Sequence, residues 1–140
     1  MTPTNATTIE IAAPIEVVWA ELLSTGNQRP WLYDTVATSD WRIGSRYEMR
    51  TADGFLMIDG DVIEVDAPHR IVLGFECHWD AKVEQEKGAT LTWELADTET
   101  GTRLTAYVTG AGPATASSSD ESNQEIYAGL KNHIEATARG

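Results

Sequence analysis

The chain has 140 residues, of which 41% are hydrophobic and 23% are charged, a composition typical of a globular domain. Ten basic residues against 22 acidic ones give a net charge of -12. This balance argues against nucleic-acid and anionic-membrane partners, because both require basic patches. The length predicts one domain over residues 1–140 with a single core.

The single cysteine excludes an internal disulfide, so nothing indicates an oxidising compartment. The first residues lack the basic start and apolar stretch of a secretory signal. No apolar run approaches the roughly 18 residues needed to span a bilayer. We therefore expect a cytoplasmic protein, monomeric or homodimeric, with no membrane partner.

The N-terminal part of the chain predicts a strand followed by a helix. Residues 7–12 alternate between apolar and polar types, as in a short strand. Pro14 then suits the first position of a helix. The apolar stripe of that helix comprises Ile15, Val18, Trp19, Leu22 and Leu23. Gly26 can end it, and a short helix or turn is expected over residues 28–32.

From residue 34 to about residue 109 the apolar period changes to two, which predicts β-strands. The strand candidates are residues 46–50, 55–66, 71–79, 91–95 and 103–108. The connections between them are short, and residues 84–88 are predicted to form a charged hairpin tip. Strands joined in this way pair antiparallel.

The C-terminal part predicts a flexible loop and then a helix. Residues 109–123 are small and serine-rich, as in a loop. The apolar stripe of the helix comprises Ile126, Leu130 and Ile134. Two capping boxes, at residues 118–121 and 122–125, leave the first helical residue open by a turn. The order of elements predicts an α+β domain in which this helix covers an antiparallel sheet of about seven strands.

Short motifs occur in a fixed order at Trp31 and at residues 9–11, 13–19, 39–45, 60–72, 91–95, 101–105 and 130–135. The series resembles the START-like, or SRPBCC, superfamily and its branch named after the activator of the 90-kilodalton heat-shock-protein ATPase. The resemblance implies a helix-grip fold, in which a curved sheet wraps the long C-terminal helix, with two short helices after the first strand. It also implies a cavity between sheet and helix. Known relatives bind lipids, hormones, polyketides or other apolar molecules, some catalyse cyclisation or hydrolysis, and others act on protein partners.

One departure from the family pattern lies near the start of the last helix. Where the family often has Gly-Trp, this chain has Ser122 and Asn123. The family residue usually helps to cover the cavity. The resemblance therefore implies a more open cavity mouth here, or a shifted helix.

Residues 75–80, FECHWD, contain the chemical parts of a thiol nucleophile or a metal site. On a strand, adjacent side chains point to opposite faces, so Cys77 and His78 should point apart. A nucleophile and its base must lie within about 3 Å of each other. We therefore predict that Cys77 behaves as a small buried hydrophobe.

No motif indicates a metal or a cofactor. The histidines His69, His78 and His133 lack the spacing of a metal site. Residues 109–113 have too few glycines for a nucleotide fingerprint, and there is no GxSxG motif. We expect no metal and no cofactor, and we assign no catalytic residue.

Asp59 and Asp61 allow two interpretations. A regular strand would aim both carboxylates inward, where burial would raise their pKa and suit them to acid–base catalysis. Alternatively, Gly60 marks a bulge that turns both acids to solvent. We favour the bulge.

Large aromatic and methionine side chains occupy the inward positions of the predicted strands. The residues that we predict to bind a ligand are Trp31, Tyr47, Met49, Met57, Phe75, Cys77, Trp79, Trp93, Tyr127, Leu130 and Ile134. The alternative is that they fill a closed core. We favour a pocket, because the fold that the sequence resembles usually contains one.

The predicted function is a module that encloses a hydrophobic, apolar or aromatic small molecule between the sheet and the C-terminal helix. One alternative is a cyclase- or hydrolase-type enzyme that uses polar groups in the same cavity. Its candidate residues are Asp59, Asp61, Tyr47 and His133. A second alternative is a chaperone-associated module that acts on a protein partner, as the name of the branch suggests.

Overall fold

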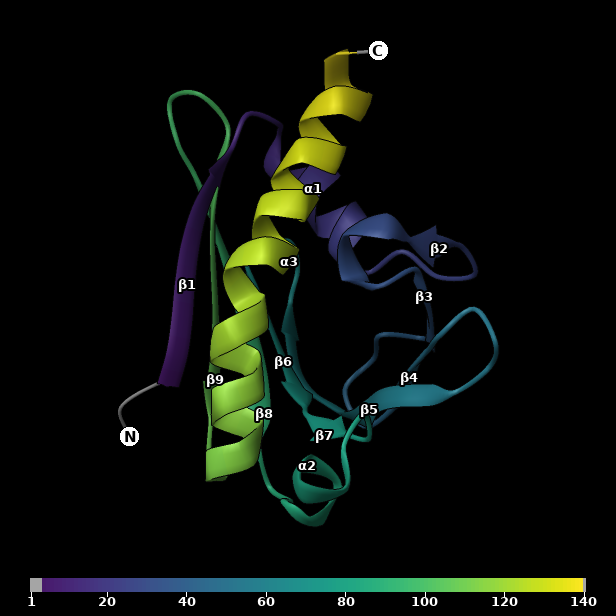
Figure 1. The fold of residues 1–140 in the computed structure, drawn as a ribbon. Helices are drawn as coiled ribbons and strands as arrows, with labels where there is room; N and C mark the ends of the chain where they lie inside the picture. Colours follow the sequence, from purple (N-terminus) through teal and green to yellow (C-terminus); the bar gives the residue numbers. More distant parts are fainter. Residues whose placement is uncertain (1–3, 140) are drawn as a thin grey trace.

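The computed structural model describes residues 4–139 as an α+β fold (Figure 1). The strands are β1 Thr4–Ile11, β2 Gln28–Arg29, β3 Thr35–Ser39, β4 Arg46–Arg50, β5 Leu56–Asp66, β6 Arg70–Gly74, β7 Glu76–Cys77, β8 Thr90–Asp97 and β9 Thr102–Thr109. The helices are α1 Ile15–Leu22, a 3-10 helix η1 Pro30–Leu32, α2 Ala81–Gln85 and α3 Pro113–Arg139. The two short helical segments expected after the first strand are therefore α1 and η1.

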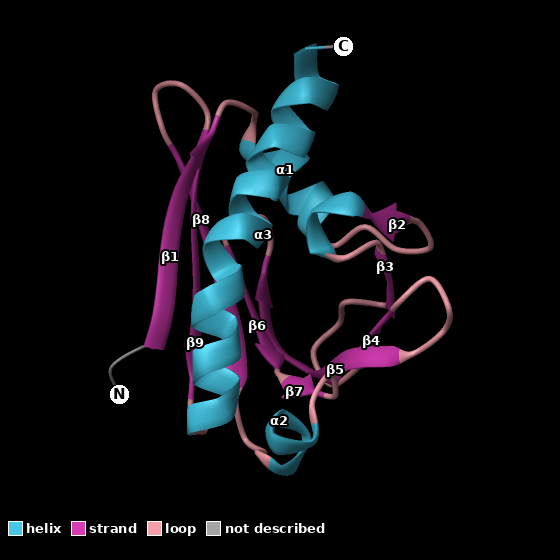
Figure 2. Ribbon diagram, in the orientation of Figure 1, coloured by secondary structure: helices cyan, strands magenta, loops and turns pink. Residues whose placement is uncertain are grey.

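One antiparallel sheet contains all the strands of the described residues, in the order β1-β9-β8-β6-β5-β4-β3-β2, and β7 pairs with β5. Seven of these strands have five or more residues, while β2 and β7 have two each. The predicted antiparallel sheet of about seven strands is thus confirmed. Figure 2 shows the sheet curving around α3, with β1, β8 and β9 on one side and β3 and β4 on the other.

The sheet bends where Gly60 of β5 approaches Gly74 of β6. A Cβ atom at Gly60 would lie only 2.3 Å from the carbonyl oxygen of Gly74, so no larger residue fits. The hydroxyl of Tyr47 donates a hydrogen bond of 2.5 Å to the same carbonyl. Glycines commonly mark sharp bends of this kind, where two backbones approach closely.

Two irregularities in β5 reset the alternation of its side chains. Met57 is an extra residue opposite β4, since Met49 pairs with Ile58 and Arg50 pairs with Leu56. Ile63 is a second extra residue, opposite β6. The sequence predicted one bulge at Gly60, whereas β5 has two, three residues before and three residues after this glycine. Asp59 and Asp61 point away from the core, which is the orientation that we favoured.

α3 crosses the concave face of the sheet and buries its apolar stripe there. Leu130 is fully buried and Ile134 is 2% exposed. α1 contributes Ile15, Val18 and Leu22 to the same core, in agreement with their helical spacing.

The loop predicted over residues 109–123 is confirmed at residues 110–112 and wrong beyond them, because α3 already begins at Pro113. Its first turn is capped from another part of the chain. The carboxylate of Glu86 accepts hydrogen bonds from the backbone N–H of Ala114 (3.0 Å) and of Thr115 (2.8 Å). This long-range cap satisfies N–H groups that a helix start otherwise leaves unpaired. The local capping boxes at residues 118–121 and 122–125 fall inside the helix.

The predicted hairpin tip at residues 84–88 is also wrong in part, because the short helix α2 occupies residues 81–85. The side chain of Asp80 caps this helix by accepting a hydrogen bond of 2.8 Å from the N–H of Lys82. The helix places Glu86 beside the start of α3.

Candidate functional site

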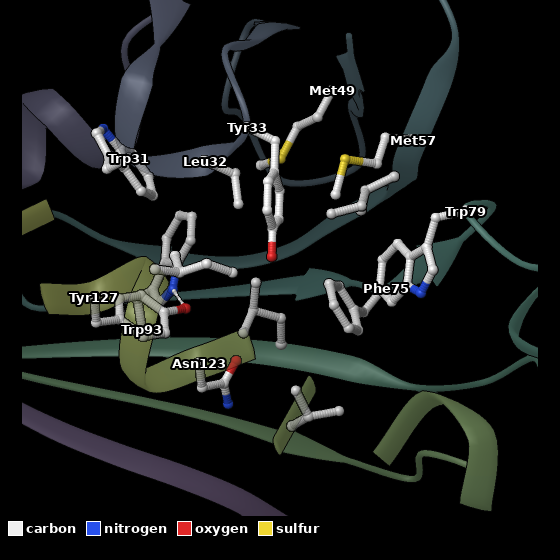
Figure 3. A pocket seen from close by; sticks show the side chains of 14 residues that line it. Trp31, Leu32, Tyr33, Met49, Met57, Phe75, Trp79, Trp93, Asn123 and Tyr127 are labelled. Carbon is white, nitrogen blue, oxygen red and sulfur yellow. Dashed lines mark hydrogen bonds between the residues drawn. The ribbon is translucent and has the colours of Figure 1, made fainter. Parts of the chain in front are cut away.

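A cavity of about 310 Å³ lies between the concave face of the sheet and the N-terminal half of α3 (Figure 3). Its lining consists of Trp31, Leu32, Tyr33, Met49, Met57, Ile58, Phe75, Trp79, Leu91, Trp93, Val108, Asn123, Ile126 and Tyr127. None of these described lining residues carries a charge. The volume lies within the usual range for small-molecule sites, whose walls are likewise mostly apolar and aromatic.

The strands supply one wall through alternate side chains that point to the concave face. Met49 on β4 faces Met57 and Ile58 on β5, and Leu91 on β8 lies beside Val108 on β9. The bulge at Met57 explains why the adjacent residues Met57 and Ile58 both reach the cavity. Thioether side chains adapt to ligand shapes more easily than branched ones do.

Phe75 and Trp79 form an aromatic pair at one side of the cavity. Their ring centroids lie 6.5 Å apart in an edge-to-face arrangement. Figure 3 shows this pair opposite Trp93 and Tyr127, across the space that the lining encloses. Aromatic rings on two sides suit a flat aromatic ligand.

Tyr33 lies at the exposed side of the cavity and has an uncommon backbone conformation. Its φ angle is 53°, and that of the next residue, Asp34, is 59°. A left-handed conformation costs about 1 to 2 kcal/mol for a residue other than glycine. The side chain of Tyr33 is half exposed, and Figure 3 shows its hydroxyl pointing into the space between the other lining residues.

Trp31 is held from outside the cavity. Its indole N–H donates a hydrogen bond of 2.9 Å to Glu21 on α1, and the guanidinium of Arg29 lies 5.5 Å from its ring centroid. Arg29 is fully buried and donates a 2.6 Å hydrogen bond to the carbonyl of Ser24. Burial lowers the pKa of Arg29 to about 10, although Glu21 raises it in part. These contacts fix the ring that Trp31 presents to the cavity.

Trp93 and Tyr127 form a polar contact at the buried end of the cavity. The indole N–H of Trp93 donates a hydrogen bond of 3.0 Å to the hydroxyl oxygen of Tyr127. Burial raises the pKa of Tyr127 to about 12, against a smaller opposing effect of this hydrogen bond. Tyr127 therefore stays neutral at physiological pH.

The structure brings together most of the residues that we predicted to bind a ligand. Seven of the eleven line the cavity, namely Trp31, Met49, Met57, Phe75, Trp79, Trp93 and Tyr127. The other four, Tyr47, Cys77, Leu130 and Ile134, lie in the packed core outside the lining. They do face inward, but at places where other side chains fill the space between the sheet and the helices.

Seven lining residues were absent from the sequence prediction: Leu32, Tyr33, Ile58, Leu91, Val108, Asn123 and Ile126. Leu91 and Val108 share the inward alternation of their strands, so the pattern could have identified them. Ile58 was hidden by the bulge at Met57. No local signal marks Leu32, the last residue of η1, or Tyr33, which follows it in a left-handed conformation.

The candidate acid–base residues lie outside the cavity lining. Asp59 and Asp61 pair with Arg46 on the outer face, at 2.5 and 3.1 Å. Tyr47 is buried in the core, and His133 lies 3.5 Å from Glu21. The arrangement therefore offers no acid–base pair at the cavity among these residues.

Within residues 75–80, the side chains of Cys77 and His78 point to opposite faces, as the alternation of side chains along a strand predicted. Cys77 is buried, and burial raises the pKa of its thiol to about 12, which makes it a poor nucleophile. The ring of His78 lies on the other side, with Nε2 2.7 Å from Asp59 and Nδ1 3.0 Å from Glu84. Burial alone would lower the pKa of His78, but the two carboxylates raise it overall.

Within residues 4–139, no group of three or more histidine, cysteine, aspartate and glutamate side chains is arranged to hold a metal ion. In the same part of the chain, none of the helices combines the length and the apolar character needed to cross a membrane.

A strongly curved antiparallel sheet that grips a long C-terminal helix, with an apolar cavity between them, defines the helix-grip class of α+β proteins. The sequence matches the family described as "Activator of Hsp90 ATPase homolog 1-like protein" over residues 12–135. The chain belongs to this family, which confirms the resemblance seen in its motifs. No curated protein matches the sequence.

Several solved structures share the fold. Protein MLL2253 from Mesorhizobium loti is 19% identical with a TM-score of 0.74, over 94% of this chain and 96% of that one. Protein CV1439 from Chromobacterium violaceum is 21% identical with a TM-score of 0.69, over 93% and 95%. The AHSA1-like protein from Aeromonas hydrophila is 22% identical with a TM-score of 0.66, over 95% and 92%. At these identities the likeness establishes the fold alone.

Proposed function

We propose that this domain binds an apolar, aromatic small molecule in the cavity between the sheet and α3. The observation that carries the proposal is the uncharged lining of about 310 Å³, rich in aromatic and methionine side chains. Enclosing an apolar molecule there removes its surface from water, at roughly 25 cal/mol per Å². Membership of the family adds support, since the helix-grip fold is expected to enclose a cavity.

The two alternative functions have less support. The enzyme alternative depends on four candidate polar residues, Asp59, Asp61, Tyr47 and His133. None of these residues lines the cavity. The partner-protein alternative rests on the description of the family alone. It stays a prediction, to be checked by a pull-down for a stoichiometric chaperone complex.

The proposal is tested by thermal unfolding with a panel of apolar aromatic compounds, followed by titration calorimetry. A ligand at 100 times its Kd stabilises the folded state by about 2.7 kcal/mol, which raises the melting temperature by roughly 8 °C. The blocking variant is Asn123→Trp, which places an indole among the lining residues at the position where the family often has tryptophan. The matched control is Glu125→Trp, because Glu125 is exposed on the same helix.

We expect Asn123→Trp to abolish the thermal shift while the variant remains folded, and Glu125→Trp to retain it. A panel that leaves the wild-type melting temperature unchanged would overturn the proposal. So would ligands that stabilise Asn123→Trp as strongly as the wild type, because they would bind elsewhere.

A further inference from the structure

The hydrogen bond between Trp93 and Tyr127 has a fixed direction. An indole N–H is a donor only, so the phenol oxygen of Tyr127 must be the acceptor. Both side chains line the cavity and are almost fully buried, with 2% and 6% of their surface exposed. Trp93 comes from β8 and Tyr127 from α3, so the pair joins the two walls of the cavity.

The hydroxyl hydrogen of Tyr127 remains available for a second hydrogen bond. Within the described part of the chain, Trp93 is the one hydrogen-bond partner of this hydroxyl. The acceptor side of the oxygen is used by Trp93, and the phenol stays protonated at neutral pH. A buried donor without an acceptor is costly, so a molecule in the cavity gains by supplying one.

We infer that Tyr127 is the specificity-determining donor of the cavity and selects flat aromatic ligands that carry a carbonyl-type acceptor, with Trp93 as its positioning residue. This inference rests on the proposed function and names the chemical class of its ligand. Figure 3 shows the hydroxyl of Tyr127 beside the indole nitrogen of Trp93, at the edge of the space that the lining encloses.

The other groups in the cavity lining restrict the chemical class of the ligand further. A carboxylate ligand would be buried without a cation, since the lining is uncharged and the whole chain carries a net charge of -12. A ligand hydroxyl that needs an acceptor finds the oxygen of Tyr127 already engaged by Trp93. Of the remaining polar lining groups, the indole N–H of Trp31 is bonded to Glu21, and those on Tyr33, Trp79 and Asn123 belong to side chains that are at least partly exposed. The ligand therefore enters with its carbonyl toward Tyr127 and its other end toward Tyr33.

The test uses two probes of nearly equal shape, 2-acetylnaphthalene and 2-isopropenylnaphthalene, which differ in having C=O or C=CH₂. Their Kd values are measured by titration calorimetry on the wild type, on the double variant Trp93→Phe/Tyr127→Phe and on Tyr107→Phe. The double variant also removes the indole N–H of Trp93, which would otherwise be left free to donate to the ketone. Tyr107→Phe is the matched control, because its hydroxyl bonds to Arg70 and Glu94 away from the cavity. A single net hydrogen bond predicts that the wild type binds the ketone about fivefold to tenfold tighter than the alkene.

We expect the double variant Trp93→Phe/Tyr127→Phe to bind both probes equally, and Tyr107→Phe to keep the preference. An infrared measurement with a ¹³C-labelled carbonyl gives an independent readout. The stretching band should lie at lower wavenumber in the wild type than in the double variant, and Trp93→Phe should fall between them. The preference of the wild type between the two probes tests the inference even if a variant fails to fold.

Equal binding of the two probes to the wild type would overturn the inference and leave the proposed function standing. A ketone preference that survives in the double variant would do the same. If neither probe nor any other apolar aromatic compound binds the wild type, the proposed function fails together with this inference.

Discussion

The two halves of α3 meet the same sheet in different ways. In the C-terminal half, Leu130 and Ile134 are buried in a packed core. In the N-terminal half, Asn123, Ile126 and Tyr127 line the cavity instead. One helix thus serves as a core element along one part of its length and as a cavity wall along the other.

The anchors of the two halves differ as well. In the C-terminal half, Glu135 accepts a 2.8 Å hydrogen bond from the backbone N–H of Ala12 and a 2.6 Å one from Lys131. The N-terminal half is tied at its start by Glu86. The C-terminal half thus supplies stability through buried apolar side chains, whereas the half that borders the cavity is anchored at its start by the carboxylate of Glu86.

The largest expected effect is a difference in the free energy of unfolding between two alanine variants, one in each half of α3. Leu130→Ala removes a fully buried side chain and should lower the free energy of unfolding by about 3 kcal/mol. Ile126→Ala enlarges a space that is already open, so it should cost about 1 kcal/mol or less. Urea denaturation of both variants measures the difference. Equal costs would show that the cavity half is packed as tightly as the core half.

The second prediction removes the cap of α3. In Glu86→Ala, the N–H groups of Ala114 and Thr115 lose their acceptor, so their hydrogen exchange should accelerate while that of Leu130 and Ile134 stays slow. The melting temperature should fall less than in Leu130→Ala. Glu99→Ala, in an exposed turn, is the control and should change neither. Uniformly faster exchange along the whole helix would mean that its two halves unfold together.

The same cap predicts a dependence on acid. The hydrogen bonds from the first turn of α3, chiefly from Thr115, hold the pKa of Glu86 below its usual value. Its contribution to stability is therefore present above the unfolded pKa and is lost as the pH falls through the folded pKa. Glu86→Ala should lack this component of the acid response.

The smallest effect concerns His78, which ties α2 to the sheet through Glu84 and Asp59, the latter also paired with Arg46. Its pKa is raised in the folded state. The stabilisation is therefore complete below the unfolded value of about 6.5 and is lost as the pH rises through the folded pKa. As the pH rises from about 6 to about 9, the urea concentration at the midpoint of unfolding should fall more for the wild type than for His78→Gln. Parallel profiles for the two proteins would contradict this assignment.

Much of the fold could be predicted from the sequence because its signals are local. The helical spacing of Ile15, Val18 and Leu22 and the alternation of the strand residues follow directly from helix and strand geometry. The start of α3 could not be predicted in this way. Its cap, Glu86, lies 28 residues before Ala114, so neighbouring residues carry no trace of it.

The apolar and aromatic character of the cavity could be predicted from the sequence, but the set of residues that line it could be predicted only in part. Alternation shows which face a side chain takes, but not whether the opposite layer fills the space there. Tyr47 and Cys77 therefore face inward like Trp93 and yet lie in the packed core. Tyr33 reaches the cavity through a left-handed turn that is rare for tyrosine and has no sequence signature.

The distribution of tryptophan gives the cavity an optical property. Three of the five tryptophans, Trp31, Trp79 and Trp93, line it, while Trp19 packs on the core and Trp41 stacks on Tyr47. Three of the five intrinsic ultraviolet emitters are therefore rings that an occupant would touch. A ligand that absorbs in the near ultraviolet should quench this emission by energy transfer, so the protein reports its own occupancy without any added label.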